Sequence, residues 1–208
     1  MTFGAMKTKV SKLIHDPSYT AISEEDVGAA INDALRYWKN KRFWFNEAVD
    51  TSVTFTASTA AIGDMPSDIL YPLERGGIVL DYQNMRYELQ KIRPEEYDAM
   101  NNETEGRPLY YTYRTAAYEV YPYPDQAYTG VVRYIQDYSD LSAASDTNDF
   151  TTNAEALLVY DAASRLQAER NQDEKMEAYF TARAKNEYNI LLSRTNKQNS
   201  TGSIAVYG

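Results

Sequence analysis

The sequence has no cysteine and only one histidine, His15, among its 208 residues. The absence of cysteine excludes disulfide bonds, thiolate nucleophiles and zinc–thiolate sites. A serine–histidine–acid triad would have to use His15, but this residue precedes Asp16 and Pro17 at a predicted helix end, where histidine commonly serves as a helix-terminal cation. The chain also lacks a glycine-rich phosphate loop. We therefore expect no catalytic residues, no metal site and no cofactor.

Long apolar runs and an excess of positive charge are missing as well. No stretch approaches the roughly 20 apolar residues of a membrane span, and the opening segment, MTFGAMKTKVSKLIHD, contains no apolar signal core. The 21 lysines and arginines stand against 30 acids, which gives a formal net charge of −9. Because a duplex nucleic-acid binder needs a basic excess to displace counterions, this balance argues against one. We expect no membrane insertion, no export by a cleaved signal, and folding in a reducing compartment.

Tyrosine, in contrast, is abundant: the chain has 19, and nine of them lie between Pro108 and Tyr138. A tyrosine side chain combines a large apolar ring with a polar tip and few rotatable bonds, so it suits contact surfaces. Alternation along strands would place these rings on both faces of a sheet. We therefore predict that half are core and half are interface; stacked rings that hold sugars are the alternative. The candidate contacts are Tyr110, Tyr121 and Tyr123.

Both ends of the chain show helical periodicity. Ser23 and Asp26 resemble a capping box, and apolar residues then recur at helical spacing as far as Trp38. A shorter helix is predicted before Pro17, and similar apolar stripes return in the C-terminal part of the chain. We expect helices over about 5–42 and 153–194 to pack together as a bundle.

The segment between these helical regions is aromatic, β-branched and interrupted by turn residues. RFWFNEAVDTSVTFTAS opens a series of short alternating runs that continues to Tyr138. We predict an antiparallel β-rich insertion over about 43–138, and hence an α+β fold. Alternation in the FWF motif would turn Trp44 to the side opposite its neighbours. Trp44 and Trp38 are therefore candidate partner contacts.

The C-terminal end combines positive charge with a short apolar terminus. Four basic residues outweigh Glu187 there, although the whole chain is acidic: Arg183, Lys185, Arg194 and Lys197. The sequence then becomes polar and linker-like before it ends in three apolar candidates: Ile204, Val206 and Tyr207. We predict one domain over 1–194 and an extended docking tail over 195–208 that orders on another subunit. A frayed tail is the alternative.

Several segments, in this order, resemble the head-to-tail adaptor proteins of tailed phages, which are also called connector, head completion or tail accessory proteins. The segments are RFWFNEAVDTSVTFTAS after an amphipathic helix, MPSDI at 65–69, PLYYTYRTAAYEVYPYPDQAYTGVVRYI, and TNAEALLVYDAASRLQAE. The likeness covers most of residues 20–195. Each motif is structural and aromatic, so the order of the motifs carries the specificity.

The resemblance implies a structural protein of the virion neck, assembled in the host cytoplasm, rather than an enzyme. It implies a ring, usually of twelve copies, that binds beneath the portal, meets nozzle or tail-tube proteins and continues the DNA channel during genome ejection. DNA would then be passing cargo, and an acidic chain suits a wall along which DNA slides. By the same match, the helical bundle and residues 183–208 would contact the portal or neighbouring copies. The large β insertion is closer to the short-tailed phage type.

A second hypothesis is a phage protein that degrades peptidoglycan or binds sugars, using tyrosine platforms and a carboxylate pair. Thirty acids make such pairs available by chance, and the sequence favours none of them. The candidate acids are Glu47, Asp64, Asp68, Glu95, Glu96, Glu103 and Glu105. A generic soluble interaction domain is the third hypothesis.

Overall fold

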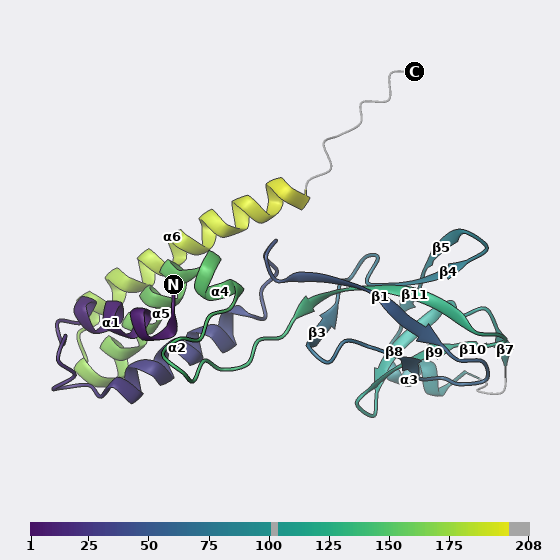
Figure 1. The fold of residues 1–208 in the computed structure, drawn as a ribbon, viewed down its shortest axis with the longest axis horizontal. Helices are drawn as coiled ribbons and strands as arrows, with labels where there is room; N and C mark the ends of the chain where they lie inside the picture. Colours follow the sequence, from purple (N-terminus) through teal and green to yellow (C-terminus); the bar gives the residue numbers. More distant parts are fainter. Residues whose placement is uncertain (101–103, 200–208) are drawn as a thin grey trace, which may run out of the picture. The chain divides into compact units, whose positions relative to one another are not determined.

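The computed structural model describes residues 1–100 and 104–199, which form six α-helices and eleven strands (Figure 1). The chain divides into two compact units, each with its own apolar core. A helical unit joins Met1–Asn46 to the segment that starts at Tyr138, and a β unit consists of Glu47–Asp137. The predicted α+β fold is confirmed: helices from both ends of the chain pack together, and a β-rich region is inserted between them.

Five helices build the helical unit: α1 (Phe3–Leu13), α2 (Glu24–Trp38), α4 (Asp149–Asn153), α5 (Glu155–Leu166) and α6 (Glu174–Asn199), with a π-helical turn at Gln167–Asn171. The α2 helix begins as the sequence predicts. The Ser23 hydroxyl accepts a hydrogen bond from the Asp26 N–H at 3.1 Å, and the acids of the first turn face the positive end of the helix.

The core of the helical unit forms around α5, which packs against α1, α2 and α6 (Figure 1). Side chains from all four helices are almost completely buried there: Met6, Val10, Ile31, Leu35, Leu157, Leu158 and Phe180. Burial of one such side chain contributes about 1.5–3 kcal/mol. The shared apolar face, more than helix propensity, therefore stabilises the bundle.

Asp16 organises the loop between α1 and α2. Its carboxylate accepts hydrogen bonds from the backbone N–H groups of Thr20, Ala21 and Ile22 at 2.8–2.9 Å. These bonds, led by the one from Ile22, lower the pKa of Asp16 to about 2. The adjacent His15 is exposed and follows α1 in the left-handed conformation, with φ 60°. The lone histidine thus ends a helix, and the neighbouring carboxylate holds the loop.

The structure corrects the predicted start of the β-rich insertion, because residues 43–46 belong to the helical unit and the first strand begins at Glu47. Asn46 folds this segment into a turn: its side-chain oxygen accepts the Phe43 N–H at 2.8 Å, and its amide donates to the Lys41 carbonyl at 2.8 Å. The turn stacks Phe43 on Phe45, with ring centres 5.2 Å apart. Both rings join the helical core instead of alternating along a strand.

The α6 helix ends at Asn199 and not at the predicted residue 194. Thr195, where the extended tail was expected to begin, is buried. Its hydroxyl accepts the Trp44 N–H at 3.3 Å and donates to the Leu191 carbonyl at 3.0 Å. These bonds tie the end of α6 to the aromatic turn. The rest of the predicted tail, residues 200–208, lies outside the described residues.

The β unit contains a main sheet with the strand order β2–β1–β11–β4–β5 and with β3 paired to β11. The strands are β1 (Glu47–Phe55), β2 (Ile62–Gly63), β3 (Ile69–Pro72), β4 (Ile78–Tyr82), β5 (Met85–Glu88) and β11 (Tyr128–Gln136). All pairings in this sheet are antiparallel. Gly130 on β11 leaves room for Phe55, since a Cβ there would lie 2.6 Å from the Phe55 ring and 2.5 Å from the Val79 carbonyl oxygen.

A second sheet, β6–β8–β9, carries the tyrosine-rich segment. Its strands are β6 (Gln90–Lys91), β8 (Tyr110–Arg114) and β9 (Ala117–Tyr121). The pairing of β8 with β9 is antiparallel, whereas β6 pairs with β8 in parallel, as β10 (Tyr123–Pro124) does with β7 (Glu105–Gly106). The short helix α3 (Pro94–Asp98) packs against β8, and its own residue Tyr97 is buried. Proline stands at its first helical position, where its missing N–H costs no hydrogen bond.

Candidate functional site

Trp38, a predicted partner contact, lies at the end of α2 and is half-buried in the helical unit. Its indole N–H donates to the Asp161 carboxylate at 2.9 Å, and its ring lies 5.1 Å from the Tyr188 ring. Trp44 is also half-buried and packs edge-on against Phe45. Both indoles therefore contribute to the helical core, and their contact with a partner stays a prediction.

The outer side of α6 carries a continuous exposed stripe. At 100° per residue, five exposed residues fall within about 60° of one another around this helix. We call them the α6 stripe: Tyr179, Arg183, Ile190, Arg194 and Lys197. Tyr179 is 52% exposed and Ile190 is 42% exposed. The stripe combines two large apolar side chains with three of the four predicted basic contacts.

One cation of the α6 stripe, Arg183, contacts a neighbouring tyrosine ring. The Arg183 guanidinium lies 5.3 Å from the centre of the Tyr160 ring and donates to the Tyr160 hydroxyl at 3.4 Å. This hydrogen bond raises the pKa of Arg183, so the residue remains a cation. Lys185 is exposed but lies about 160° around the helix from Arg183. The four predicted cations therefore do not form one surface.

Three other predicted contacts, Ile204, Val206 and Tyr207, lie outside the described residues. The tyrosine candidates all lie in the β unit and are half-buried: Tyr110, Tyr121 and Tyr123. Tyr110 and Tyr121 are direct partners across β8 and β9. Their role as contacts stays a prediction.

Strict alternation does not describe the burial of β8. Tyr111 is 2% exposed and Tyr113 is 52% exposed, although the sequence pattern places them on one face. Thr112, on the opposite face, is fully buried, and α3 packs against the same strand. The Tyr113 side chain lies near the turn at Thr115, where the β8–β9 hairpin ends, and it is therefore exposed. The exposed ring of Tyr113 was not among the predicted contacts.

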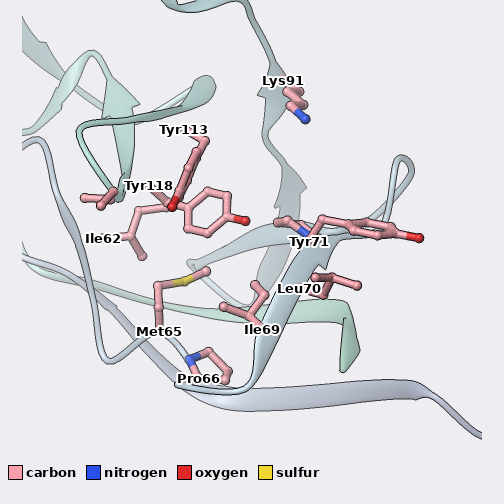
Figure 2. Close-up of a pocket in the computed structure, with 12 residues that line it drawn as sticks. Ile62, Met65, Pro66, Ile69, Leu70, Tyr71, Lys91, Tyr113 and Tyr118 are labelled. Carbon is pink, nitrogen blue, oxygen red and sulfur yellow. The ribbon is translucent and has the colours of Figure 1, made fainter. Parts of the chain in front are cut away.

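Tyr113 borders a pocket of about 480 Å³ in the β unit, which we call the β3 pocket (Figure 2). Apolar and aromatic side chains dominate its lining, including Ile62, Met65, Ile69, Leu70, Tyr113 and Tyr118. Figure 2 shows the side chains of Met65, Ile69 and Tyr118 pointing toward one another, with Lys91 at the edge. Burial raises the pKa of Tyr118 to about 12, so its hydroxyl stays neutral.

The described residues that line the β3 pocket include neither a carboxylate nor an imidazole, so they offer little for acid–base chemistry. Four of the seven acids proposed for a hydrolytic pair accept hydrogen bonds from neighbouring groups: Asp64, Asp68, Glu96 and Glu105. Glu103 lies outside the described residues. Among the carboxyl groups that the structure describes, Asp16, Asp26, Asp50 and Asp146 have pKa values that hydrogen bonds lower, whereas a general acid needs a raised pKa.

Within residues 1–100 and 104–199, no group of three or more histidine, aspartate or glutamate side chains is placed to hold a metal ion. The described helices include none that is long and apolar enough to cross a membrane. The candidate contact surfaces among the described residues are the α6 stripe, the half-buried tyrosines and the β3 pocket.

Comparison with known proteins agrees with this picture of a contact protein. A family model described as SU10 adaptor protein matches residues 1–206, which is nearly the whole chain. No curated protein matches the sequence.

Proposed function

Because the chain belongs to the SU10 adaptor protein family, a family of phage head-to-tail adaptors, we propose that it forms a ring that joins the portal to the tail and continues the DNA channel. Family membership makes the chain a structural component of a virion that associates with other virion components, and it implies a role other than catalysis. The ring is expected to contain twelve copies, and its specific partners are expected to be the portal and the tail proteins.

The observation that carries the portal contact is the α6 stripe. Its three cations stand out in a chain with a formal net charge of −9, and one exposed ring, Tyr179, and one exposed aliphatic side chain, Ile190, provide apolar area beside them. Aromatic and arginine side chains are enriched at protein interfaces, where apolar anchors supply most of the affinity. We assign this stripe to the portal and expect an acidic, partly apolar surface on that partner.

The assembly itself is expected to be built from contacts between different surfaces of adjacent copies, because a closed ring of many subunits requires heterologous interfaces. The half-buried tyrosines of the β unit supply one such surface. The acidic balance of the chain suits a channel wall, because negative charge disfavours stable contacts with DNA phosphates.

Native mass spectrometry of the purified chain, with and without its portal, tests this proposal. We expect one closed complex that contains a portal ring and a full set of adaptor copies. A chain that stays monomeric and ignores the portal would contradict it.

Two charge-reversal variants localise the contact on α6. The double variant Arg183→Glu, Arg194→Glu should weaken portal binding at least tenfold, a loss that corresponds to about 1.4 kcal/mol. Lys185→Glu is the matched control, because it reverses a charge on the same helix but away from the stripe. Equal losses from both variants would refute the assignment of the stripe to the portal.

A further inference from the structure

A second pocket of the β unit lies where the chain leaves β6 and enters α3. Its volume of about 480 Å³ is in the range of pockets that hold small molecules. We call it the α3 pocket, and its lining includes Lys91, Ile92, Arg93, Glu96, Thr112 and Tyr113. The Ile92 N–H donates to the Tyr111 carbonyl at 2.9 Å, and the Arg93 N–H donates to the Glu96 carboxylate at 3.1 Å. These bonds set the backbone around the pocket.

Thr112 gives the α3 pocket an unused hydrogen-bonding group. The residue is fully buried, and its hydroxyl has no hydrogen-bond partner within residues 1–100 and 104–199. Buried polar groups in native proteins nearly always have a partner, so an unsatisfied hydroxyl in a pocket wall points to a group that binds there. This hydroxyl can donate to a ligand oxygen.

Two exposed cations of the same lining, Lys91 and Arg93, have no carboxylate partner among the described residues. Nearby acids are engaged otherwise: Asp98 pairs with Arg114 at 3.0 Å, and Glu96 accepts the Arg93 N–H. With two cations and one carboxylate, the lining has a surplus of one positive charge. Because lysine and arginine make their strongest hydrogen bonds to anionic oxygens, this surplus suits a ligand with one negative charge.

Tyr113 adds an exposed aromatic wall. Its side chain is 52% exposed, and it lines both the α3 pocket and the β3 pocket, as Lys91 also does (Figure 2). A tyrosine ring offers a large apolar face against which a flat or apolar group packs. The α3 pocket therefore combines donors for an anionic group with a surface for the body of a ligand.

We propose that the α3 pocket binds a small organic carboxylate. The carboxylate group lies between Lys91 and Arg93 and accepts the hydrogen bond of the Thr112 hydroxyl, while the body of the ligand packs on the Tyr113 ring. Aromatic acids and sugar acids share this chemistry. The site is independent of the proposed ring, because one chain supplies all four groups.

Amide NMR of the ¹⁵N-labelled full chain tests the site directly. Benzoate and glucuronate are added in separate titrations at constant ionic strength, and acetate provides a carboxylate without a ligand body. We expect saturable shifts of the amide signals of Ile92, Arg93 and Tyr113 with at least one of the two larger acids; the stronger binder identifies the preferred body. Shifts that acetate and chloride reproduce equally indicate an adventitious ion only and overturn the proposal, as does the absence of shifts with both acids.

Two arginine variants test the contribution of charge. Arg93→Met should weaken binding of the preferred acid at least tenfold, because it removes one of the two cations. Arg75→Met is the matched control, since Arg75 is exposed in the same unit but does not line the α3 pocket. The control should change the affinity less than twofold. Equal losses from both variants would show a general effect of net charge and overturn the site.

Thr112→Val tests the hydroxyl, because valine keeps the shape of the side chain and removes the polar group. Without ligand, the thermal midpoint of this variant should equal or exceed that of wild type, since an unsatisfied hydroxyl is replaced by a methyl group. A saturating ligand should raise the midpoint of the variant less than half as much as that of wild type. A lower midpoint of the ligand-free variant would overturn the role of the hydroxyl, because the hydroxyl would then have a partner inside the protein.

Discussion

Phe43 is the residue whose placement differs most from a sequence-based expectation, and its replacement by alanine tests that placement. The side chain is fully buried in the helical unit. Its ring centre lies 5.2 Å from that of Phe45, 5.9 Å from that of Phe150 and 6.1 Å from that of Tyr188. Phe43→Ala removes all three ring contacts and leaves a cavity.

The expected loss of unfolding free energy is about 4–5 kcal/mol. Phenylalanine-to-alanine changes in cores cost about 3–5 kcal/mol, and aromatic pairs contribute about 0.5–1.5 kcal/mol each beyond area burial. Three such pairs place Phe43 in the upper part of that range. The chain has two tryptophans, Trp38 and Trp44, both in the helical unit. Urea unfolding followed by tryptophan fluorescence therefore reports on the unit that Phe43 stabilises.

Phe55→Ala is the matched control, because Phe55 is equally buried but lies on β1 in the β core. Native-state hydrogen exchange should show faster exchange in α2 and α5 for Phe43→Ala, and in β1 and β11 for Phe55→Ala. If Phe43→Ala leaves the tryptophan-monitored transition unchanged and accelerates exchange in the sheet, the assignment of residues 43–46 to the helical unit is wrong.

Three further changes have defined outcomes. Asp16→Asn should destabilise the chain at neutral pH. The folded-state pKa of Asp16, about 2, lies below its usual 3.8. The stability that the carboxylate contributes is therefore complete above about pH 4 and is lost as the pH falls toward 2. Urea midpoints of wild type and variant should converge near pH 2, and a constant difference would refute this role. Trp38→Phe removes the hydrogen bond to Asp161 and should cost about 1–3 kcal/mol; denaturant unfolding measures it, and a loss below about 0.3 kcal/mol would contradict it. Gly130→Ala brings a methyl group against the Val79 carbonyl and should lower the thermal midpoint by several degrees, roughly 2–4 °C for each kcal/mol; an unchanged midpoint in calorimetry would disprove the close packing.

Local signals predicted much of the fold. The cap at Ser23 and the proline at the start of α3 specify helix starts through neighbouring residues alone. The turn between β4 and β5 has a local signal as well, because asparagine tolerates positive φ and Asn84 adopts φ 62° there. Each of these features depends on chemistry within a few residues, which a sequence displays directly.

The aromatic motif at 43–45 could not be predicted in the same way. Its alternating pattern and β-branched continuation favour a strand, but the Asn46 side chain closes a turn there and the rings pack against Phe150, more than a hundred residues away. The end of α6 is a similar case, because buried Thr195 extends the helix by contacting Trp44. Both outcomes depend on tertiary contacts that override local propensity.

The candidate surfaces were predictable in part. A helical projection of α6 would have joined Tyr179 and Ile190 to three of the four predicted basic residues, because the spacing of these five places them on one side of the helix and sets Lys185 apart. No pattern in the sequence predicts the β3 pocket, since it depends on where the chain leaves one sheet for another and on how β3 pairs with β11. Exposure of Tyr113 likewise depends on where the β8–β9 hairpin ends, at the turn that begins with Thr115.

Electron cryomicroscopy of the purified chain bound to its portal tests the central claim most directly. We predict a closed ring of adaptor copies coaxial with the portal, with each α6 stripe against the portal surface and the channel continuous through both rings. A portal reconstruction without adaptor density, obtained at saturating concentrations of the folded chain, would contradict the account.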